Sequence, residues 1–201
     1  MGGKLIQPGN RAELVAGLRK VLSDRISLIQ SVLSVPYGNK TVPLMLWPAQ
    51  REYLDNKSHA DIILKSRQLG ITTAVCADLF IDAITIPHLT VLSIAHNDKA
   101  AETVIMPKYQ LFYALLPDMI NVKGHEIWIK PKLDGDSRSL MYFSDLNGTL
   151  LESRIRVGTA GSIGTGRGEA IHRFHGTEIA AWPEGTAAAA LAGVEGAMSS
   201  P

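Results

Sequence analysis

The residues with the clearest potential for chemistry form the segment KSRQLGITT at positions 65–73. It lies between a short apolar run at residues 61–64, predicted to be a buried strand, and residues 72–84, predicted to be a helix. A loop in that place directs backbone N–H groups and the positive end of a helix dipole toward one point, which favours a bound phosphate. We therefore expect a nucleotide phosphate to bind Lys65, Ser66, Arg67, Gln68, Leu69, Gly70, Ile71, Thr72 and Thr73.

The segment differs from the usual phosphate-loop pattern G-x-x-x-x-G-K-[ST] in two places. It keeps Gly70 and Thr72, and the Thr72 hydroxyl is expected to bind Mg²⁺. Ile71 stands where the lysine is usually found, and Lys65 stands at the first glycine position. Because such a loop wraps around the phosphate, a lysine at its start can reach the same oxygens. The alternative is a surface lysine at a strand end, followed by an ordinary turn at Gly70.

A carboxylate suited to activating water follows a second apolar-biased segment. Residues 171–175 are predicted to be a strand, and Glu178 comes just after it. Open α/β sheets bind ligands at the carboxyl ends of their strands, so Glu178 is the candidate general base. Thr177 precedes it, where an acidic metal ligand is usual, and its hydroxyl can hold a metal-bound water. The alternative is a solvated glutamate at a strand end.

The elements that must position these residues alternate between strand and helix. The sequence predicts helices at residues 11–33, 50–54, 72–84, 98–116 and 185–198, and strands at residues 61–64, 90–95, 126–129, 140–143, 154–159 and 171–175. This alternation predicts an α/β fold with a largely parallel sheet. With the phosphate loop, it favours a P-loop NTPase of the RecA-like (ASCE) type. An N-terminal helical or lid segment is expected at residues 1–45, and an ATPase core at residues 46–201.

Composition limits the partners and the compartment. The chain has 201 residues, 46% of them hydrophobic, and a net charge of +1. Such a balance gives no general positive field, so any contact with DNA must come from a local patch. Cys76 is the only cysteine, which excludes an intrachain disulfide. We expect neither a signal peptide nor a membrane-spanning segment, and therefore a soluble protein of a reducing compartment.

Four segments together resemble the large subunit of tailed-bacteriophage terminases, in its N-terminal ATPase domain. PAQREYLD at residues 48–55 looks like the adenine-contacting segment, and KSRQLGITT looks like the Walker A loop. GTGRGEAIH at residues 164–172 is similar to the stretch that leads into Walker B, and HGTEIAAWP at residues 175–183 is similar to Walker B itself.

The resemblance implies a role for individual residues. Lys65 binds the β- and γ-phosphates, Glu178 activates water, and Gln50 recognises adenine. Arg67 matches an arginine that senses the γ-phosphate or acts as an arginine finger, although a surface role stays open. Arg167 can contact phosphate or a neighbouring subunit. The implied cofactors are ATP and Mg²⁺.

The resemblance also implies a biological setting. The expected protein is an ATP-hydrolysing motor of the host cytoplasm that moves double-stranded DNA into a procapsid. It is expected to work as a homo-oligomeric ring with a portal protein and a small terminase subunit, and with no membrane. We expect the ATPase core to be truncated and a nuclease domain to be absent. Two alternatives stay open: a helicase-like ATPase, and a nucleotide-binding assembly module without turnover, which Ile71 and Thr177 favour.

Overall fold

The computed structural model describes residues 24–64, 68–122, 125–160 and 170–197, and it is built around a five-stranded sheet. The strand order of this sheet is β6-β7-β8-β3-β9, and the hairpins β1–β2 and β4–β5 lie outside it. The strands are β1 (Ser34–Tyr37), β2 (Lys40–Pro43), β3 (Thr90–Ala95), β4 (Met119–Val122), β5 (His125–Trp128), β6 (Lys132–Asp136), β7 (Leu140–Leu146), β8 (Thr149–Thr159) and β9 (Arg173–Gly176).

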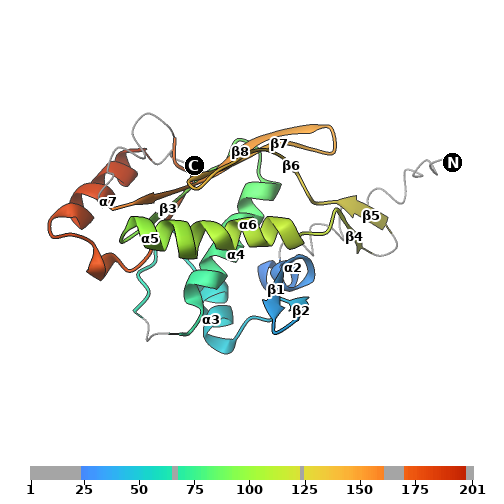
Figure 1. Ribbon diagram of the computed structural model, residues 1–201, viewed down its shortest axis with the longest axis horizontal. Helices are drawn as coiled ribbons and strands as arrows, with labels where there is room; N and C mark the ends of the chain where they lie inside the picture. The colour runs from blue at the N-terminus through green and yellow to red at the C-terminus, as the bar shows by residue number, and fades with distance from the viewer. Residues whose placement is uncertain (1–23, 65–67, 123–124, 161–169, 198–201) are drawn as a thin grey trace.

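Helices cover one face of the sheet along most of its length and the other face at one end (Figure 1). A π-helical stretch, η1 (Ala101–Ile105), joins the short α5 to α6, and a 3₁₀ turn, η3 (Ile179–Ala181), follows β9. The α-helices are α2 (Arg25–Val32), α3 (Pro48–Asn56), α4 (Ile71–Thr85), α5 (Asp98–Ala100), α6 (Met106–Leu115) and α7 (Thr186–Ala197).

The prediction of a mainly parallel sheet, and with it of a RecA-like P-loop fold, is wrong. Strand β3 is parallel to both β8 and β9. Strands β6 and β7, and strands β7 and β8, are antiparallel. The sheet is therefore mixed, with one parallel half and one antiparallel half.

The antiparallel half has a local cause in the turn between β7 and β8. Asn147 and Gly148 both have positive φ angles, 51° and 82°. Such a pair makes the tight two-residue turn of a hairpin, and Asn-Gly is its strongest sequence signal. The register confirms this, because Leu146 pairs directly with Thr149. The sequence prediction was based on the alternation of strands and helices. That alternation does not reveal the β7–β8 hairpin, so the prediction missed the antiparallel pairing.

A second prediction also fails, at the segment before the phosphate loop. Residues 61–64 form no strand, and they are exposed rather than buried. Ile62 is 93% exposed and Leu64 is 95% exposed. A short apolar run is compatible with several environments, and hydrophobicity alone does not supply a strand partner.

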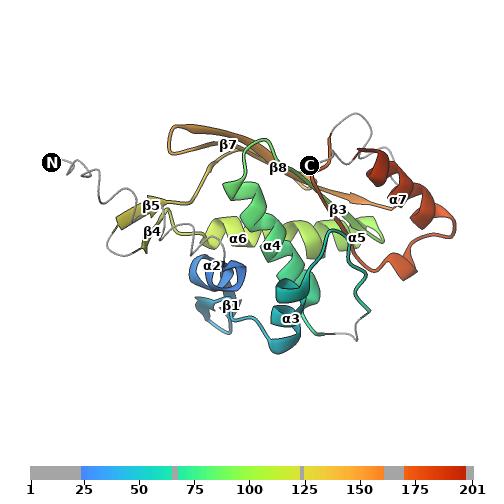
Figure 2. The same cartoon turned by 180° about the vertical axis from the view of Figure 1, so that it is seen from behind.

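Helix α4 forms the centre of the main hydrophobic core. It runs across the sheet beside α6 (Figure 2), and Phe80 packs against the rings of Phe112 and Phe143. The predicted helix at residues 72–84 is confirmed by α4. Its side chains are buried nearly all round, which fits a helix between a sheet and further helices.

Strand β3 is buried on both faces, which confirms the buried strand predicted at residues 90–95. Val91 and Ala95 belong to the core around α4 and α6. Leu92 and Ile94 belong to a second core under α7, together with Trp182. This alternation makes β3 the strand that joins the two layers.

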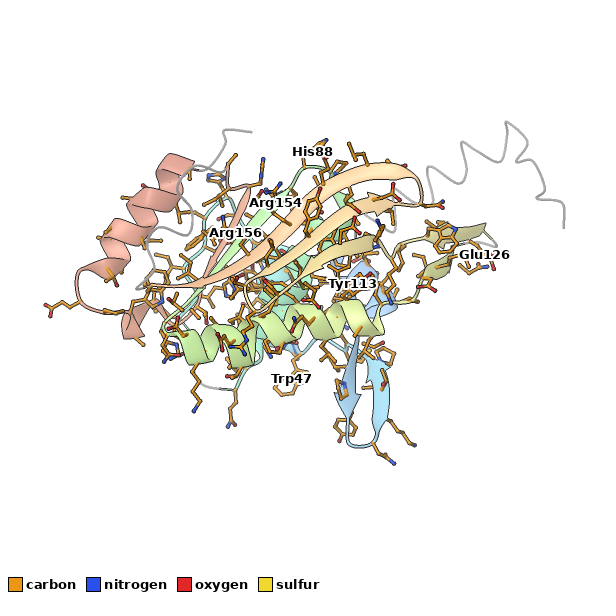
Figure 3. The ribbon with its side chains drawn as sticks, turned by 45° about the horizontal axis from the view of Figure 1, so that its top comes forward. Trp47, His88, Tyr113, Glu126, Arg154 and Arg156 are labelled. Carbon is orange, nitrogen blue, oxygen red and sulfur yellow. The ribbon has the colours of Figure 1, made fainter. Side chains whose placement is uncertain are left out.

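The predicted helices at residues 50–54 and 185–198 correspond to α3 and α7, and the predicted helix at residues 11–33 lies outside the described residues except for α2. The predicted helix at residues 98–116 is divided into α5, η1 and α6, and Pro107 lies in the first turn of α6, directly after the π-helical stretch. Residues 34–43 form the β1–β2 hairpin, which projects from the body of the molecule (Figure 3). None of the helices in the described part of the chain has the length and hydrophobicity needed to cross a membrane.

Candidate functional site

The start of helix α4 is the part of the predicted phosphate loop that the structure describes. Gly70 precedes the helix with a φ of 66°, a left-handed conformation that glycine adopts at little cost. Its carbonyl oxygen accepts hydrogen bonds from Thr73 N at 2.9 Å and Ala74 N at 3.2 Å. Gln68 is also left-handed, with a φ of 68°. The backbone therefore turns sharply just before the first helical turn.

The side chains of this turn divide between core and surface. Ile71, which replaces the usual lysine, is only 6% exposed and belongs to the hydrophobic core. Thr72 and Thr73 are half-buried, and Leu69 packs partly against the core. Ile71 therefore serves as a packing residue and holds the first turn of α4 in place.

Gln50, expected to contact adenine, lies against this turn. It is 5% exposed, and its Nε2 donates to Gly70 O at 2.9 Å. Its Oε1 accepts from the backbone N of Trp47 at 2.8 Å, at the start of α3. The amide therefore connects the 48–55 segment to the loop. Both of these hydrogen bonds go to backbone groups.

Gly70 is required for a second reason. A Cβ atom built at this position would lie 2.4 Å from Gln50 Nε2, closer than real Cβ contacts. The loop and α3 can approach each other this closely only because the residue has no side chain.

Glu178 lies immediately beyond β9, as the strand prediction required, and is exposed. Its backbone is left-handed, with φ 52° and ψ 44°. The preceding Thr177 fixes this turn, because its N–H donates to Ile94 O at 2.9 Å. Trp182 Nε1 also donates to Thr177 O at 2.9 Å, which folds η3 back on the strand end. Thr177 itself is 9% exposed.

The structure adds a residue that the sequence analysis did not select. His96 follows β3 directly, and its Nδ1 lies 3.1 Å from Glu178 Oε2. Strands β3 and β9 are parallel neighbours, so their carboxyl ends reach the same edge. The signal was present in the sequence: His96 is the first residue after a predicted buried strand.

Two other carboxylates, Asp78 and Asp82, are buried on α4 and paired with cations. The Asp78 carboxylate forms ion pairs with Arg25 Nε at 2.9 Å and with Lys57 Nζ at 2.8 Å. The Asp82 carboxylate forms ion pairs with the Arg25 guanidinium and with Arg173 Nε, the latter at 2.8 Å. Because each carboxylate is held by two cations, these groups stabilise the contacts of α2, α3 and β9 with α4.

Cys76 is not a nucleophile. The residue is buried on α4, and burial raises the pKa of its thiol to about 12. Near neutral pH the thiol therefore stays protonated, whereas the thiolate is the reactive form.

The predicted site is brought together in two parts. Gln50 bonds to Gly70, and Glu178 lies beside His96, but among the described residues no hydrogen bond or ion pair joins one part to the other. Lys65, Ser66, Arg67 and Arg167 lie outside the described residues. Within the described ranges, no group of three or more His, Cys, Asp or Glu side chains is arranged to hold a metal ion.

Comparison with known proteins adds no relative. No protein-family model matches the chain. No curated protein matches it either. The interpretation of the site therefore depends on the geometry and on the sequence motifs.

Proposed function

We propose that this chain is an ATP-hydrolysing motor subunit of a viral DNA-packaging terminase. The observation that carries the proposal is the contact between Gln50 and Gly70, because it joins two segments that the sequence assigns separately to adenine and to phosphate. Gly70 is left-handed and directly precedes the first turn of α4, and the N–H groups that begin a helix favour a bound anion.

The parallel half of the sheet supports the same proposal despite the mixed topology. Strands β8, β3 and β9 run in one direction, so their carboxyl ends form one edge. Ligands of α/β sheets bind at that edge, and the exposed carboxylate of Glu178 lies there.

The proposed reaction is hydrolysis of ATP to ADP and phosphate. The oxygen of a water molecule attacks the γ-phosphorus, the water proton passes to the Glu178 carboxylate, and the bond to the ADP oxygen breaks. Lys65, at the front of the loop, offsets negative charge on the transferred phosphoryl group.

The oxygen donors of Thr72 and Thr177 fit Mg²⁺, which prefers hard oxygen ligands and completes its shell with water and phosphate oxygens. Thr72 lies in the first turn of α4 and would bind the ion directly, whereas Thr177 would act through a bound water. Bound Mg²⁺ would supply positive charge next to the phosphates. Thr177 contributes no charge of its own, so Lys65 carries more of the electrostatic stabilisation.

The motor proposal extends to partners that the motifs suggest. Double-stranded DNA is the translocated substrate, and a homo-oligomeric ring with a portal protein and a small terminase subunit is the working assembly. The host cytoplasm is the proposed location.

Glu178→Gln tests the proposed chemistry. We expect the rate of ATP hydrolysis to fall by about 10²- to 10⁴-fold, because an amide cannot accept the proton, while ATP binding is retained. Lys65→Ala is expected to reduce both hydrolysis and binding. Steady-state phosphate release and titration with a fluorescent ATP analogue measure the two quantities.

Glu152→Gln is the matched control for Glu178→Gln. Glu152 also has a left-handed backbone, with a φ of 49°, and its Oε2 lies 3.2 Å from His88 Nδ1. It lies in β8, and we expect its substitution to leave hydrolysis unchanged. Equal activity of the wild-type protein and Glu178→Gln would rule out the proposed role of Glu178.

One observation favours a second function, a nucleotide-binding assembly module without turnover. Ile71 is part of the core and cannot contact phosphate with a charged group. In that case ATP binding raises the thermal midpoint of the protein, and wild-type protein releases no phosphate above a protein-free blank.

A further inference from the structure

The side chain of His96 lies beside the proposed general base, Glu178. The two residues are 82 positions apart, and parallel pairing of β3 with β9 brings them to one edge. In that register Ile94 pairs with Gly176, so each of the two residues lies two positions beyond a paired residue. Their proximity is therefore fixed by the sheet and does not depend on a mobile loop.

The backbone of Glu178 is held firmly, whereas its carboxylate is not. Thr177 N donates to Ile94 O, and Ala181 N donates to Glu178 O at 2.8 Å. The side chain of Glu178 is 56% exposed, so its rotamer is free unless a neighbouring group restricts it. A general base is effective only in a narrow range of positions, which makes this freedom costly.

His96 is placed to restrict that rotamer. Its Nδ1 is buried and has no hydrogen-bond partner of good geometry, although Glu178 Oε2 is 3.1 Å away. A buried polar atom without a partner is unfavourable, and a small rotation of the carboxylate provides one. The neutral imidazole with its proton on Nδ1 is a suitable donor for this bond.

We propose that His96 is a positioning residue for Glu178, directing its carboxylate toward the attacking water. The inference rests on the proposed function, since it assigns a role in the same reaction. His96 does not exchange a proton with the substrate: it donates one hydrogen bond to Glu178, and the proton from water goes to the other carboxylate oxygen.

The same strand provides an internal comparison. His88 lies just before β3, and its Nδ1 is 3.2 Å from Glu152 Oε2, nearly the same separation as in the first pair. His88 is 64% exposed, against 27% for His96. This pair matches the first in chemistry but lies at the amino end of β3.

The test compares His96→Ala, His96→Asn and His88→Ala with the wild-type chain under saturating Mg·ATP. We expect His96→Ala to lower kcat by about tenfold with little change in KM, because the carboxylate loses its orientation while the nucleotide site is intact. His96→Asn keeps an amide donor near the position of Nδ1 and should restore kcat to within about threefold of wild type. His88→Ala should match wild type.

A spectroscopic readout reports the contact directly. In ¹⁵N-edited NMR spectra of the imidazole groups, Glu178→Gln should shift the His96 signals and leave those of His88 in place, and Glu152→Gln should do the reverse. Unchanged His96 signals in Glu178→Gln would overturn the proposal. So would a His96→Ala enzyme with wild-type kcat, or equal losses in His96→Ala and His96→Asn.

These outcomes separate the inference from the function on which it rests. If wild-type protein hydrolyses ATP and Glu178→Gln does not, an unaffected His96→Ala enzyme rejects only the positioning role. If wild-type protein releases no phosphate above a protein-free blank, the hydrolase proposal itself fails, and the role of His96 fails with it.

Discussion

At the scale of single residues, left-handed backbone occurs in both parts of the candidate site, and it also occurs outside them, at Glu152 and Gly38. Glu178, Gln68 and Gly70 all have positive φ angles, and each lies in or beside a segment that the sequence analysis selected for function. A left-handed glutamate costs free energy, so it persists only where neighbouring contacts impose it. Here the Thr177 and Trp182 hydrogen bonds do so.

Gly70→Ala tests the close approach of the loop to α3. We expect the free energy of unfolding to fall by more than about 2 kcal/mol, because left-handed strain of about 1–2 kcal/mol adds to the clash with Gln50 Nε2. Urea unfolding followed by circular dichroism measures the change. Gln50→Ala combined with Gly70→Ala should recover the clash component, because the larger side chain is gone.

Gly38→Ala is the matched control for the Gly70 substitution. Gly38 has a φ of 60°, close to that of Gly70, but no atom lies within 4 Å of a Cβ built there. The loss of stability in Gly38→Ala should therefore come from left-handed strain alone. If both substitutions cost the same, Gln50 does not restrict position 70.

At the scale of elements, buried ion pairs attach α2 and β9 to α4. Asp82→Asn should lower the free energy of unfolding by about 1–3 kcal/mol, because charged hydrogen bonds to a buried carboxylate are lost, while Arg173 is 47% exposed and Arg25 keeps its pair with Asp78. Asp134→Asn is the control: Asp134 pairs with the exposed Lys132, and its loss should leave stability close to that of wild type. A loss in Asp82→Asn no larger than in this control would show that the buried pairs add nothing.

Elements with strong patterns were predictable from the sequence, and pairings between distant elements were not. The apolar run of β3 and the long helical pattern of α4 identified both elements correctly. The Asn147–Gly148 turn carried a clear hairpin signal, which a reading based on alternation overlooked. At residues 61–64 a strand was predicted and none is formed, because four apolar-biased residues do not specify a partner strand.

In the candidate site, too, the local position of a residue was predictable and its long-range contacts were not. Glu178 was predictable because it follows a strand, and Gly70 because it begins a helix. The contact of Glu178 with His96 depends on which strands are neighbours, and the contact of Gln50 with Gly70 depends on how α3 packs. Both are tertiary facts, and local propensity carries no information about them.

At the scale of the whole molecule, the sheet has two different halves. The parallel half, β8-β3-β9, carries Glu178 and is covered on both faces where α7 lies. In the antiparallel half, α4 and α6 cover one face, and the opposite face presents Arg154 and Arg156 of β8 (Figure 3). Both halves share the core around α4, so we expect them to unfold together.

Acid sensitivity of this global unfolding is expected to depend on His175 in β9. Its Nδ1 is buried without a hydrogen-bond partner, and burial lowers the pKa of the imidazole from 6.5 to about 4. The unfolded chain therefore binds a proton at a higher pH than the folded one. Stability from this group is present above pH 6.5 and is lost as the pH falls toward 4, by at most about 3 kcal/mol.

His175→Asn removes the titrating group and should flatten the pH dependence of unfolding between pH 6.5 and 4 in nucleotide-free and metal-free protein. Urea midpoints measured across this range for wild type, His175→Asn and, as a control substitution at an exposed histidine, His88→Ala give the comparison. The pKa of carboxylates such as Asp24 is lowered by hydrogen bonds from Ser27, so their protonation at lower pH also reduces the free energy of unfolding. That loss is common to all three proteins, so the difference between slopes isolates His175. Parallel curves for wild type and His175→Asn would mean that the imidazole accepts a proton in the folded state as readily as in the unfolded chain.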